Sequence, residues 1–390
     1  MQLIVVNAKD TEKKFIEVAV QLYANDSKWI RPLDKDINDV FDQNKNKAYR
    51  FGETIRWILL DDTGKLIGRI AAFVNKKYKN KGDDVAAGGM GFFECINQQD
   101  AANLLLDTAK NWLLEKGMQS MDGPINFGER DRWWGLVTAG FDEPLYCMNY
   151  NPPYYVELLK NYGFLPFYNQ LCYSLDPKKP LQAKIHDRHA QYLDKPGFCT
   201  KHFEKNKVEK YAQDFVTVYN KAWAGHGGMK ELSKEQALIL FKKMLPIMNP
   251  KLVWFAYYED APIAMFVNLP DLNQWFKYLN GKFSIFHQLY FLMLKTFVSN
   301  KKFNGLVFGV VPEWQGKGID AYIIGESARK YFQTNNCPYT QYEMQWIGDF
   351  NPKMINIVEG LGETFQSRQL TTFRYLFDRN KRFVRHPMIQ

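Results

Sequence analysis

The chain has 390 residues, which is longer than one hydrophobic core usually supports, so two domains of roughly 150 to 200 residues are expected. Apolar residues make up 46% and charged residues 24%, an ordinary globular composition without the low-complexity tracts of a disordered chain. The net charge of +9 suits nucleic acid, a membrane surface or a phosphorylated ligand, but solvated lysines explain it as well. Because the basic clusters are short and lack a nucleic-acid motif, nucleic acid is not the expected partner.

The five cysteines are an odd number without a CxxC pair, which excludes a disulfide framework and a zinc knuckle, so no metal is expected. This pattern favours a reducing cytoplasm, and residues 1–14 lack the basic and apolar regions of a secretory signal. The longest apolar run, 283–298, contains polar side chains and is too short to cross a bilayer, so no transmembrane segment is expected. We interpret it as a buried or lid-forming helix, with an amphipathic surface for an acyl chain as the alternative.

The sequence of the first half predicts a series of strands and helices. In chain order, the expected elements are a strand at 3–6, a helix with Phe15, Val18, Ala19 and Leu22 on one face, strands at 57–60, 66–74 and 91–96, a helix over about 100–115, a strand near 119–125, a long loop, a helix at 152–162 and a strand at 167–175. The following segment, 176–196, is rich in Pro, Lys, His and Gln without a period, so we expect the connector there.

The second half repeats the plan. The expected elements are a strand at 198–203, helices at 208–221 and 234–244, paired strands at 252–258 and 262–268, the apolar helix, a strand at 305–311, a glycine-rich turn, a helix over about 320–332, a strand at 340–346, a helix after Pro352 and a strand at 371–377. The domains are therefore predicted as residues 1–180 and 197–390, joined by a linker at 181–196.

An Asn-Pro pair opens a helix in each half, at Asn151-Pro152 and Asn351-Pro352, and the two helices end near Gly163 and Gly362. An Asn cap, a Pro in the first turn and a Gly after the last turn are typical of any helix of this length. The shared order of elements on both sides is therefore the stronger indication of a duplication.

The stretch VVPEWQGKGID, from Val310 to Asp320, lies between an apolar strand and an amphipathic helix. Gly316 and Gly318 allow dihedral angles that turn successive backbone N–H groups into one concavity at a helix N-terminus, which suits phosphate oxygens. Lys317 adds a positive charge. The stretch matches neither GxGxxG nor GxxxxGK[ST], and a plain tight turn is the alternative interpretation.

This stretch resembles the acetyl-CoA loop of the GNAT (GCN5-related N-acetyltransferase) superfamily, in which Gln or Arg is followed by two residues, Gly, one residue, and Gly or Ala. Gln315, Gly318 and the preceding Val-x-Pro match this pattern. Asp320 departs from it, because a carboxylate would repel a pyrophosphate unless it caps the helix or points away. Similar loops, with PDLNQ as at 270–274, Asn280-Gly281 and the set Trp346, Asn351 and Met354, mark a poorly characterised group of bacterial tandem GNAT-like proteins.

The resemblance covers most of the chain and implies an α/β fold of two tandem GNAT-like domains, each a mixed, mostly antiparallel sheet flanked by helices. It implies that acetyl-CoA or another acyl-CoA is the co-substrate. The residues that would hold it are Val310, Val311, Gln315, Gly316, Lys317, Gly318, Ile319 and Asn351. In GNAT proteins the strand before the loop splays from the next strand, so the thioester would lie between strands 305–311 and 340–346.

An acceptor amine must be neutral to attack the thioester, so a base is expected nearby. Glu343 is the first candidate, and a Glu on the solvated face of its strand is the alternative. For the acceptor itself, His226 lies where GNAT acceptors bind, and Asp271, Asn273 and Gln274 form a polar cluster directly after a strand. A polar loop histidine and a capped turn explain the same residues.

The first half lacks the loop, because the corresponding place reads ECINQQDAA at 94–102, without a glycine. We therefore expect residues 1–180 to form a degenerate domain. The leading hypothesis is an acyl-CoA-dependent N-acyltransferase acting on a small-molecule or peptide amine. A transferase that uses long acyl chains or aminoacyl-tRNA, and a non-catalytic scaffold in which Asp320 marks a decayed site, are the alternatives.

Overall fold

The structure is a computed structural model that describes residues 1–80, 82–83, 85–223 and 231–388. Strands and helices alternate in the first half, as the sequence predicts. They are β1 (Gln2–Val5), α1 (Lys9–Leu22), α2 (Asp34–Val40), β2 (Gly52–Leu60), β3 (Leu66–Asn75), β4 (Ala87–Cys95), α3 (Gln99–Glu115), β5 (Ser120–Gly123), β6 (Leu136–Ala139), α4 (Tyr155–Tyr162) and β7 (Leu165–Leu175). The sequence analysis misses α2 and β6, which are too short to show a period.

The second half follows the same plan. Its elements are α5 (Ala183–Ala190), β8 (Phe198–His202), α6 (Val208–Trp223), α7 (Lys234–Met244), β9 (Val253–Tyr258), β10 (Ala261–Pro270), α8 (Asn273–Phe276), α9 (Ile285–Phe297), β11 (Lys302–Val310), α10 (Ile319–Ser327), β12 (Gln341–Gly348), α11 (Pro352–Glu359) and β13 (Phe365–Leu376). Helix α5 falls inside the segment expected to be a connector, so that segment is partly helical.

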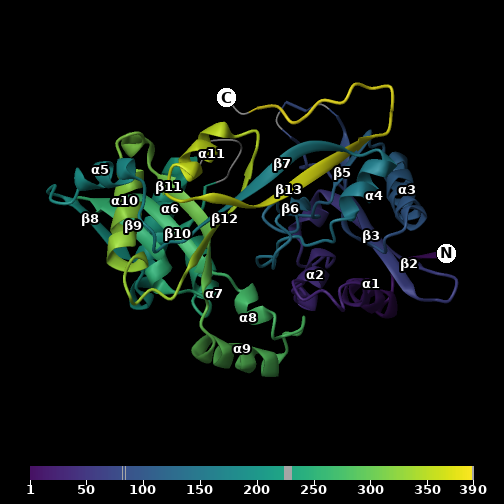
Figure 1. Ribbon diagram of the computed structural model, residues 1–390, viewed down its shortest axis with the longest axis horizontal. Helices are drawn as coiled ribbons and strands as arrows, with labels where there is room; N and C mark the ends of the chain where they lie inside the picture. Colours follow the sequence, from purple (N-terminus) through teal and green to yellow (C-terminus); the bar gives the residue numbers. More distant parts are fainter. Residues whose placement is uncertain (81, 84, 224–230, 389–390) are drawn as a thin grey trace.

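The strands form one sheet in the order β1-β2-β3-β4-β5-β13-β7-β12-β11-β10-β9-β8, with β6 paired to β13. Two neighbouring pairs in the described part of the chain, β4–β5 and β11–β12, are parallel, and the other pairs are antiparallel. Figure 1 shows the two halves at opposite ends of this sheet, with β7 and β13 running between them. The sheet is thus mixed, mostly antiparallel and flanked by helices, as the sequence predicts.

The two halves exchange their last strands. Strand β7, from the first half, pairs with β12 of the second half, and β13, from the second half, pairs with β5 of the first half. The exchanged strands also pair with each other, from Phe365↔Ser174 to Arg374↔Leu165. Each half therefore depends on the other for a strand. The domain bounds of 1–180 and 197–390, with a linker at 181–196, stay a prediction.

The two Asn-Pro pairs play different roles. Asn351 caps α11, because its side chain accepts a hydrogen bond from the backbone N–H of Met354 at 3.3 Å. Asn151 is buried, and its Oδ1 accepts from the backbone N–H of Val137 at 2.8 Å. The expectation that Asn151 caps a helix is therefore wrong, because β6 uses its side chain and α4 begins only at Tyr155.

Candidate active site

Strands β11 and β12 separate after a short parallel stretch. They pair from Lys302↔Gln341 to Gly305↔Met344, and both strands then continue without pairing to each other. Between Met344 and Ile347 the register of β12 shifts against β7, its neighbour on the other side. Such an irregularity bends a strand, so it accounts for β12 turning away from β11. The backbone of β11 beyond Gly305 therefore faces an opening.

A cavity of about 580 Å³ lies in this opening. Its walls come from β11, β12, α10 and α11, and from the segment that follows β7. Most of the lining side chains are apolar, among them Phe303, Leu306, Phe308, Ile324, Met344 and Met354. This size is typical of a pocket for a small molecule or cofactor. The composition of the walls suits a hydrocarbon chain better than a charged ligand.

The loop between β11 and α10 has the conformation that the glycine pattern predicts. Residues 312–314 form a short 3₁₀ turn, and Gly316 and Gly318 have positive φ angles of 71° and 86°. The backbone N–H groups of residues 316–318 make no hydrogen bond to any other described residue. A Cβ added to Gly316 would meet no atom within 4 Å. Free amides on an open side of a helix N-terminus are a suitable site for phosphate oxygens.

The side chains of this loop have defined positions. Gln315 Nε2 donates to the Val310 carbonyl at 3.0 Å, and Lys317 Nζ lies 5.4 Å from the centre of the Trp314 ring. Val311 and Ile319 are buried against the core of the second half. Asn351 lies apart from the loop, where it lines the cavity. The role of these residues in binding a cofactor stays a prediction.

Asp320 lies near Tyr192, and burial of the Tyr192 hydroxyl and the negative charge of Asp320 both raise the pKa of that tyrosine. Tyr192 also donates a hydrogen bond of 2.6 Å to the Lys317 carbonyl. No Asp320 atom lies within 4 Å of the position that a Cβ on Gly316 would take. Arg188 lies beside the loop as well, because a Cβ on Gly318 would be 3.5 Å from the Arg188 Cβ. The sequence analysis missed these linker residues, because local patterns do not show which loop they contact.

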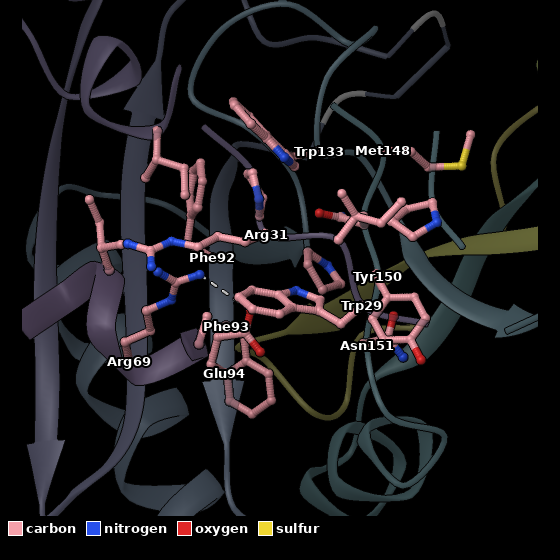
Figure 2. A pocket seen from close by; sticks show the side chains of 18 of the residues that line it. Trp29, Arg31, Arg69, Phe92, Phe93, Glu94, Trp133, Met148, Tyr150 and Asn151 are labelled. Atoms are coloured by element: carbon pink, nitrogen blue, oxygen red, sulfur yellow. Dashed lines mark hydrogen bonds and ion pairs between the residues drawn. The ribbon is translucent and has the colours of Figure 1, made fainter. Parts of the chain in front are cut away.

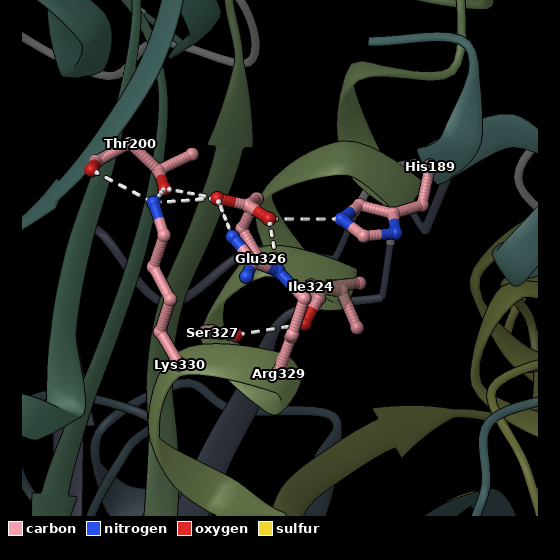
Figure 3. A network of polar contacts seen from close by, with 7 residues as sticks. All are labelled: His189, Thr200, Ile324, Glu326, Ser327, Arg329 and Lys330. Carbon is pink, nitrogen blue, oxygen red and sulfur yellow. Dashed lines mark hydrogen bonds and ion pairs between the residues drawn. The ribbon is translucent and has the colours of Figure 1, made fainter. Parts of the chain in front are cut away.

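A buried ionic network fixes this linker on α10 (Figure 3). Glu326 accepts hydrogen bonds from Arg329 Nε at 2.9 Å and Thr200 Oγ1 at 3.3 Å, and it forms an ion pair with Lys330. His189 Nε2, on α5, lies 3.1 Å from the same carboxylate. Burial alone would raise the pKa of Glu326, but the bonds from Arg329, Lys330 and His189 hold it at about 2. The carboxylate therefore stays charged and keeps α5 next to the glycine loop between β11 and α10.

Glu343 lies on the face of β12 opposite the cavity. Its neighbours Tyr342 and Met344 line the cavity, and side chains alternate along a strand. Glu343 is 5% exposed, so the alternative of a solvated glutamate is wrong. Its carboxylate accepts hydrogen bonds from Ser367 Oγ at 2.9 Å and from Gln341 Nε2, which are both neutral donors.

Asn304 was not anticipated from the sequence, yet it lies beside Glu343 as its register partner on β11. Its Oδ1 is buried and has no hydrogen-bond partner among the described residues. A buried polar atom of this kind costs free energy unless a ligand or water satisfies it. The point where the strands separate therefore carries a carboxylate and a free acceptor atom. A polar asparagine in the middle of an apolar strand was the signal for it in the sequence.

The polar cluster after β10 joins the two halves. Asp271 Oδ1 accepts hydrogen bonds from the backbone N–H groups of Tyr146 at 3.2 Å and Asn273 at 3.3 Å. Asn273 Nδ2 donates to the Pro144 carbonyl at 2.8 Å. Burial raises the pKa of Asp271 to about 6, although Lys302 and these hydrogen bonds oppose the shift. Gln274 lies next to them on α8, and a role of the cluster in acceptor binding stays a prediction.

His226 lies outside the described residues. Among the described residues, no group of three His, Cys, Asp or Glu side chains is placed to hold a metal ion. None of the described helices is both long and apolar enough to cross a membrane.

The corresponding opening in the first half is closed. Strands β4 and β5 pair from Ala87↔Ser120 to Gly89↔Asp122, after which the Ile125 N–H donates to the Met90 carbonyl at 2.7 Å. The two backbones touch, since a Cβ on Gly91 would lie 2.0 Å from the Ile125 oxygen.

Only a cavity of about 60 Å³ remains beside β4, shown in Figure 2. Its acidic group is already paired, because Glu94 contacts Arg69 at 3.3 Å and accepts from Tyr23 and Tyr155 at 2.7 and 2.9 Å. A space of this size holds about two waters, each of which occupies roughly 30 Å³ in the liquid. The space beside β4 therefore has no room for an acyl thioester. The larger cavity of the first half, about 520 Å³, lies away from β4, along residues such as Asn46, Phe73 and Asn126.

No protein-family model matches the chain. It is 23% identical over 357 residues to a protein of Caulobacter vibrioides named bacterial ceramide synthase, a match that covers 90% of this chain and 91% of that protein. It is 22% identical over 363 residues to protein YghO of Escherichia coli K12, covering 91% and 90% of the two chains.

Solved structures agree on the architecture. A tandem GNAT protein from the clavulanic acid biosynthesis pathway matches 96% of this chain and 98% of its own, with a TM-score of 0.53 at 10% identity. The GCN5-related glucosamine N-acetyltransferase region of a fungal multi-domain β-N-acetylglucosaminidase has a TM-score of 0.52 at 11% identity. That match covers 96% of this chain, which spans only 38% of the fungal protein. The chain therefore has the fold of the tandem GNAT proteins.

Proposed function

We propose that this protein transfers an acyl group from an acyl-CoA to an amine, and that its second half holds the cofactor. The observation that carries the proposal is the opening between β11 and β12, with its cavity of about 580 Å³ and a loop of free amides at the end of β11. The closed opening between β4 and β5 in the first half supports the same assignment. The similarity to a protein named bacterial ceramide synthase supports an amine as the acceptor.

Each part of the site has a defined task in this proposal. The amides of residues 316–319 bind the pyrophosphate, and Lys317 and Arg188 add positive charge beside it. The free backbone of β11 beyond Gly305 offers hydrogen bonds to the pantetheine arm. The bound acyl-CoA supplies an activated thioester carbonyl at the point where the strands separate. The acceptor reaches this point from the opposite face, where Glu343 and Asn304 lie.

Glu343 takes a proton from the incoming ammonium, directly or through a water, so that the amine becomes nucleophilic. The nitrogen then forms a bond to the carbonyl carbon, and the carbon–sulfur bond breaks. The nitrogen loses a second proton as the amide forms, the departing thiolate takes up a proton in its place, and the products are an amide and free CoA. Asn304 Oδ1 accepts a hydrogen bond from the amine and orients it for attack.

The apolar walls of the cavity favour a long acyl chain over acetyl. Burying each methylene group contributes about 0.8 kcal/mol, so a chain that fills part of the cavity gains several kcal/mol over acetyl. The five cysteines are free, which supports a reducing compartment such as the cytoplasm as the place of this reaction.

Calorimetric titration with acetyl-CoA and with palmitoyl-CoA below its micelle concentration tests the proposal. We expect both to bind, with palmitoyl-CoA at least about tenfold tighter. Gly316→Glu should abolish binding by placing a carboxylate in the phosphate site. Gly64→Glu is the matched control, because Gly64 also has a positive φ of 84° and open space around it, but lies on a distant turn.

Absence of heat with either donor at millimolar concentration would disprove the proposal and leave the non-catalytic scaffold as the better interpretation. If the donors bind, release of CoA thiol in the presence of candidate amines measures the transfer. Mass spectrometry of small molecules retained by the purified protein would guide the choice of amine.

A further inference from the structure

Helix α9 carries an apolar face that no part of the described chain covers. Its outward side chains are largely exposed: Ile285 62%, Phe286 77%, Leu289 60%, Leu292 48%, Met293 48% and Phe297 80%. Figure 1 shows α9 at the lower edge of the molecule, below α7 and α8. An exposed apolar surface of this extent on one helix is unusual for a soluble monomer and indicates an interaction site.

The helix is held firmly by its other side. Phe291 and Leu294 are buried in a cluster with Leu272, Trp275 and Phe276 from the α8 region. The Trp275 indole donates to the Val298 carbonyl at 3.0 Å at the end of α9. The exposed face is therefore presented by an anchored helix. The prediction of a buried or lid-forming helix is wrong for this outer side, because Phe291 and Leu294 alone among its residues are buried.

The charges around α9 indicate the kind of surface it meets. Along the chain, residues 272–312 contain five lysines and no aspartate or glutamate. From other elements, Glu143 pairs with Lys277 at 3.3 Å, and the charge of Lys282 acts on Asp34. Lys282 and Lys301 are exposed, and they flank the two ends of the helix. An apolar helix face between cationic ends is typical of helices that lie in the interface of an anionic membrane. A symmetric contact between two copies of the face would bring lysines toward lysines, which opposes self-association.

We propose that the outer face of α9 docks this protein onto the surface of a bilayer that contains anionic lipids. The apolar side chains enter the boundary between headgroups and acyl chains, and Lys282 and Lys301 contact lipid phosphates. Helix α8 begins two residues after Asp271, and Asp271 lies beside Asn304, the register partner of Glu343. Docking therefore brings the acceptor side of the sheet toward the lipid. The docking itself does not depend on the proposed transferase activity.

Cosedimentation of the full chain with vesicles tests this proposal. We expect binding to vesicles of phosphatidylglycerol and phosphatidylcholine, and at least about tenfold weaker binding to phosphatidylcholine alone. The triple variant Phe286→Ser/Leu289→Ser/Phe297→Ser should lose at least about tenfold in affinity for the anionic vesicles. The variant Lys282→Gln/Lys301→Gln should bind them more weakly and respond less to added salt.

The matched control is Leu114→Ser/Leu165→Ser/Val384→Ser, which removes three exposed apolar side chains elsewhere and should bind like the parent protein. Circular dichroism melting verifies that each variant is folded. Failure of the parent to cosediment, or equal binding by the α9 triple variant, would overturn the proposal. So would a dimer in sedimentation velocity that the α9 variant dissociates, since the face would then be an interface between copies. Cosedimentation needs no acyl-CoA, so a negative result leaves the transferase proposal unaffected.

Discussion

The two parallel strand pairs, β4–β5 and β11–β12, begin alike, but only the second pair separates into an open cavity. In the first half, β4 and β5 share three pairs, and the chain after β5 then returns to bond with Met90. In the second half, β11 and β12 share four pairs, and β12 then bends away and leaves the cavity of about 580 Å³. The same strand order thus produces a closed opening at one end and a cavity at the other. The difference arises in the second strand of each pair: the chain after β5 returns to β4, whereas β12 bends away from β11.

The buried carboxylates on these strands show the same contrast. Asp122, on β5, receives two hydrogen bonds from Arg374, at 2.6 and 2.7 Å, and one from Tyr78. Glu343, on β12, receives hydrogen bonds only from neutral side chains among the described residues, and one of them is Ser367. Arg374 and Ser367 both belong to β13, so the exchanged strand contributes stability at one end and a contact to the candidate base at the other.

The largest effect is expected at Arg374. Arg374→Leu leaves the buried carboxylates of Asp122 and Asp83 without their cation, and removing one partner of a buried ion pair costs about 3–5 kcal/mol. Urea denaturation should show this loss in the free energy of unfolding. Arg379→Leu, an exposed arginine three residues after β13, should change it by less than about 0.5 kcal/mol. Equal effects of the two variants would mean that the exchanged strand is not anchored by this ion pair.

A second prediction concerns Asp271, where the halves touch. Because its pKa is raised to about 6 from an ordinary value of 3.8, the folded state holds a proton that the unfolded state has lost between these pH values. The stability that this group contributes therefore falls as the pH rises from 3.8 to 6 and is constant above. The full loss is about 3 kcal/mol, at 1.36 kcal/mol per pH unit.

Asp271→Asn retains an oxygen that can accept from Tyr146 and Asn273 but does not ionise. The variant should therefore lack this decline, and near pH 7 it should be more stable than the parent protein. Denaturation curves of both proteins from pH 4 to 8 measure the difference. Parallel stability profiles would show that Asp271 ionises normally in the folded state.

A third prediction separates the two carboxylate environments. Glu343→Gln should lower kcat by at least about 100-fold, as expected for the loss of a general base, and should leave the Kd for acyl-CoA nearly unchanged. Asp122→Asn should instead reduce the free energy of unfolding, with little effect on kcat at temperatures where the protein is folded. Thiol-release kinetics and denaturation on both variants test this pairing. A kcat for Glu343→Gln close to that of the parent would exclude Glu343 as the base.

Local patterns predicted most elements of the fold. Helix α7 begins and ends where the sequence predicts, and the glycine loop before α10 has the predicted left-handed residues. These features depend on side chains within a few positions of each other, which the sequence displays directly. The pairing of β7 with β12 and of β13 with β5 was not predicted. An apolar strand does not specify its neighbour, because the partner is chosen by packing across the whole sheet.

For the candidate site too, the sequence predicted the features that depend on local patterns and missed those that depend on packing. The pattern predicted the conformation of the glycine loop and singled out Glu343, because both belong to short stretches with a recognisable order, while their roles stay predictions. It missed Asn304 and Arg188, which reach the site only through the pairing of β11 and the packing of α5. The missing glycine predicted a degenerate first domain, but it did not predict that the opening between β4 and β5 is closed, which the hydrogen bond from Ile125 to Met90 shows.

The smallest effect is expected from filling the open site. Leu306 lines the cavity and is 43% exposed, so a larger side chain there can occupy the opening without disturbing the core. Leu306→Trp should weaken palmitoyl-CoA binding by about tenfold, equivalent to about 1.4 kcal/mol, and acetyl-CoA binding by less. Leu165→Trp is the matched control, because Leu165 is equally exposed but does not line the cavity. If Leu306→Trp binds palmitoyl-CoA like the parent protein, the acyl chain does not occupy this cavity. The separation of β11 from β12 would then not serve to bind an acyl chain.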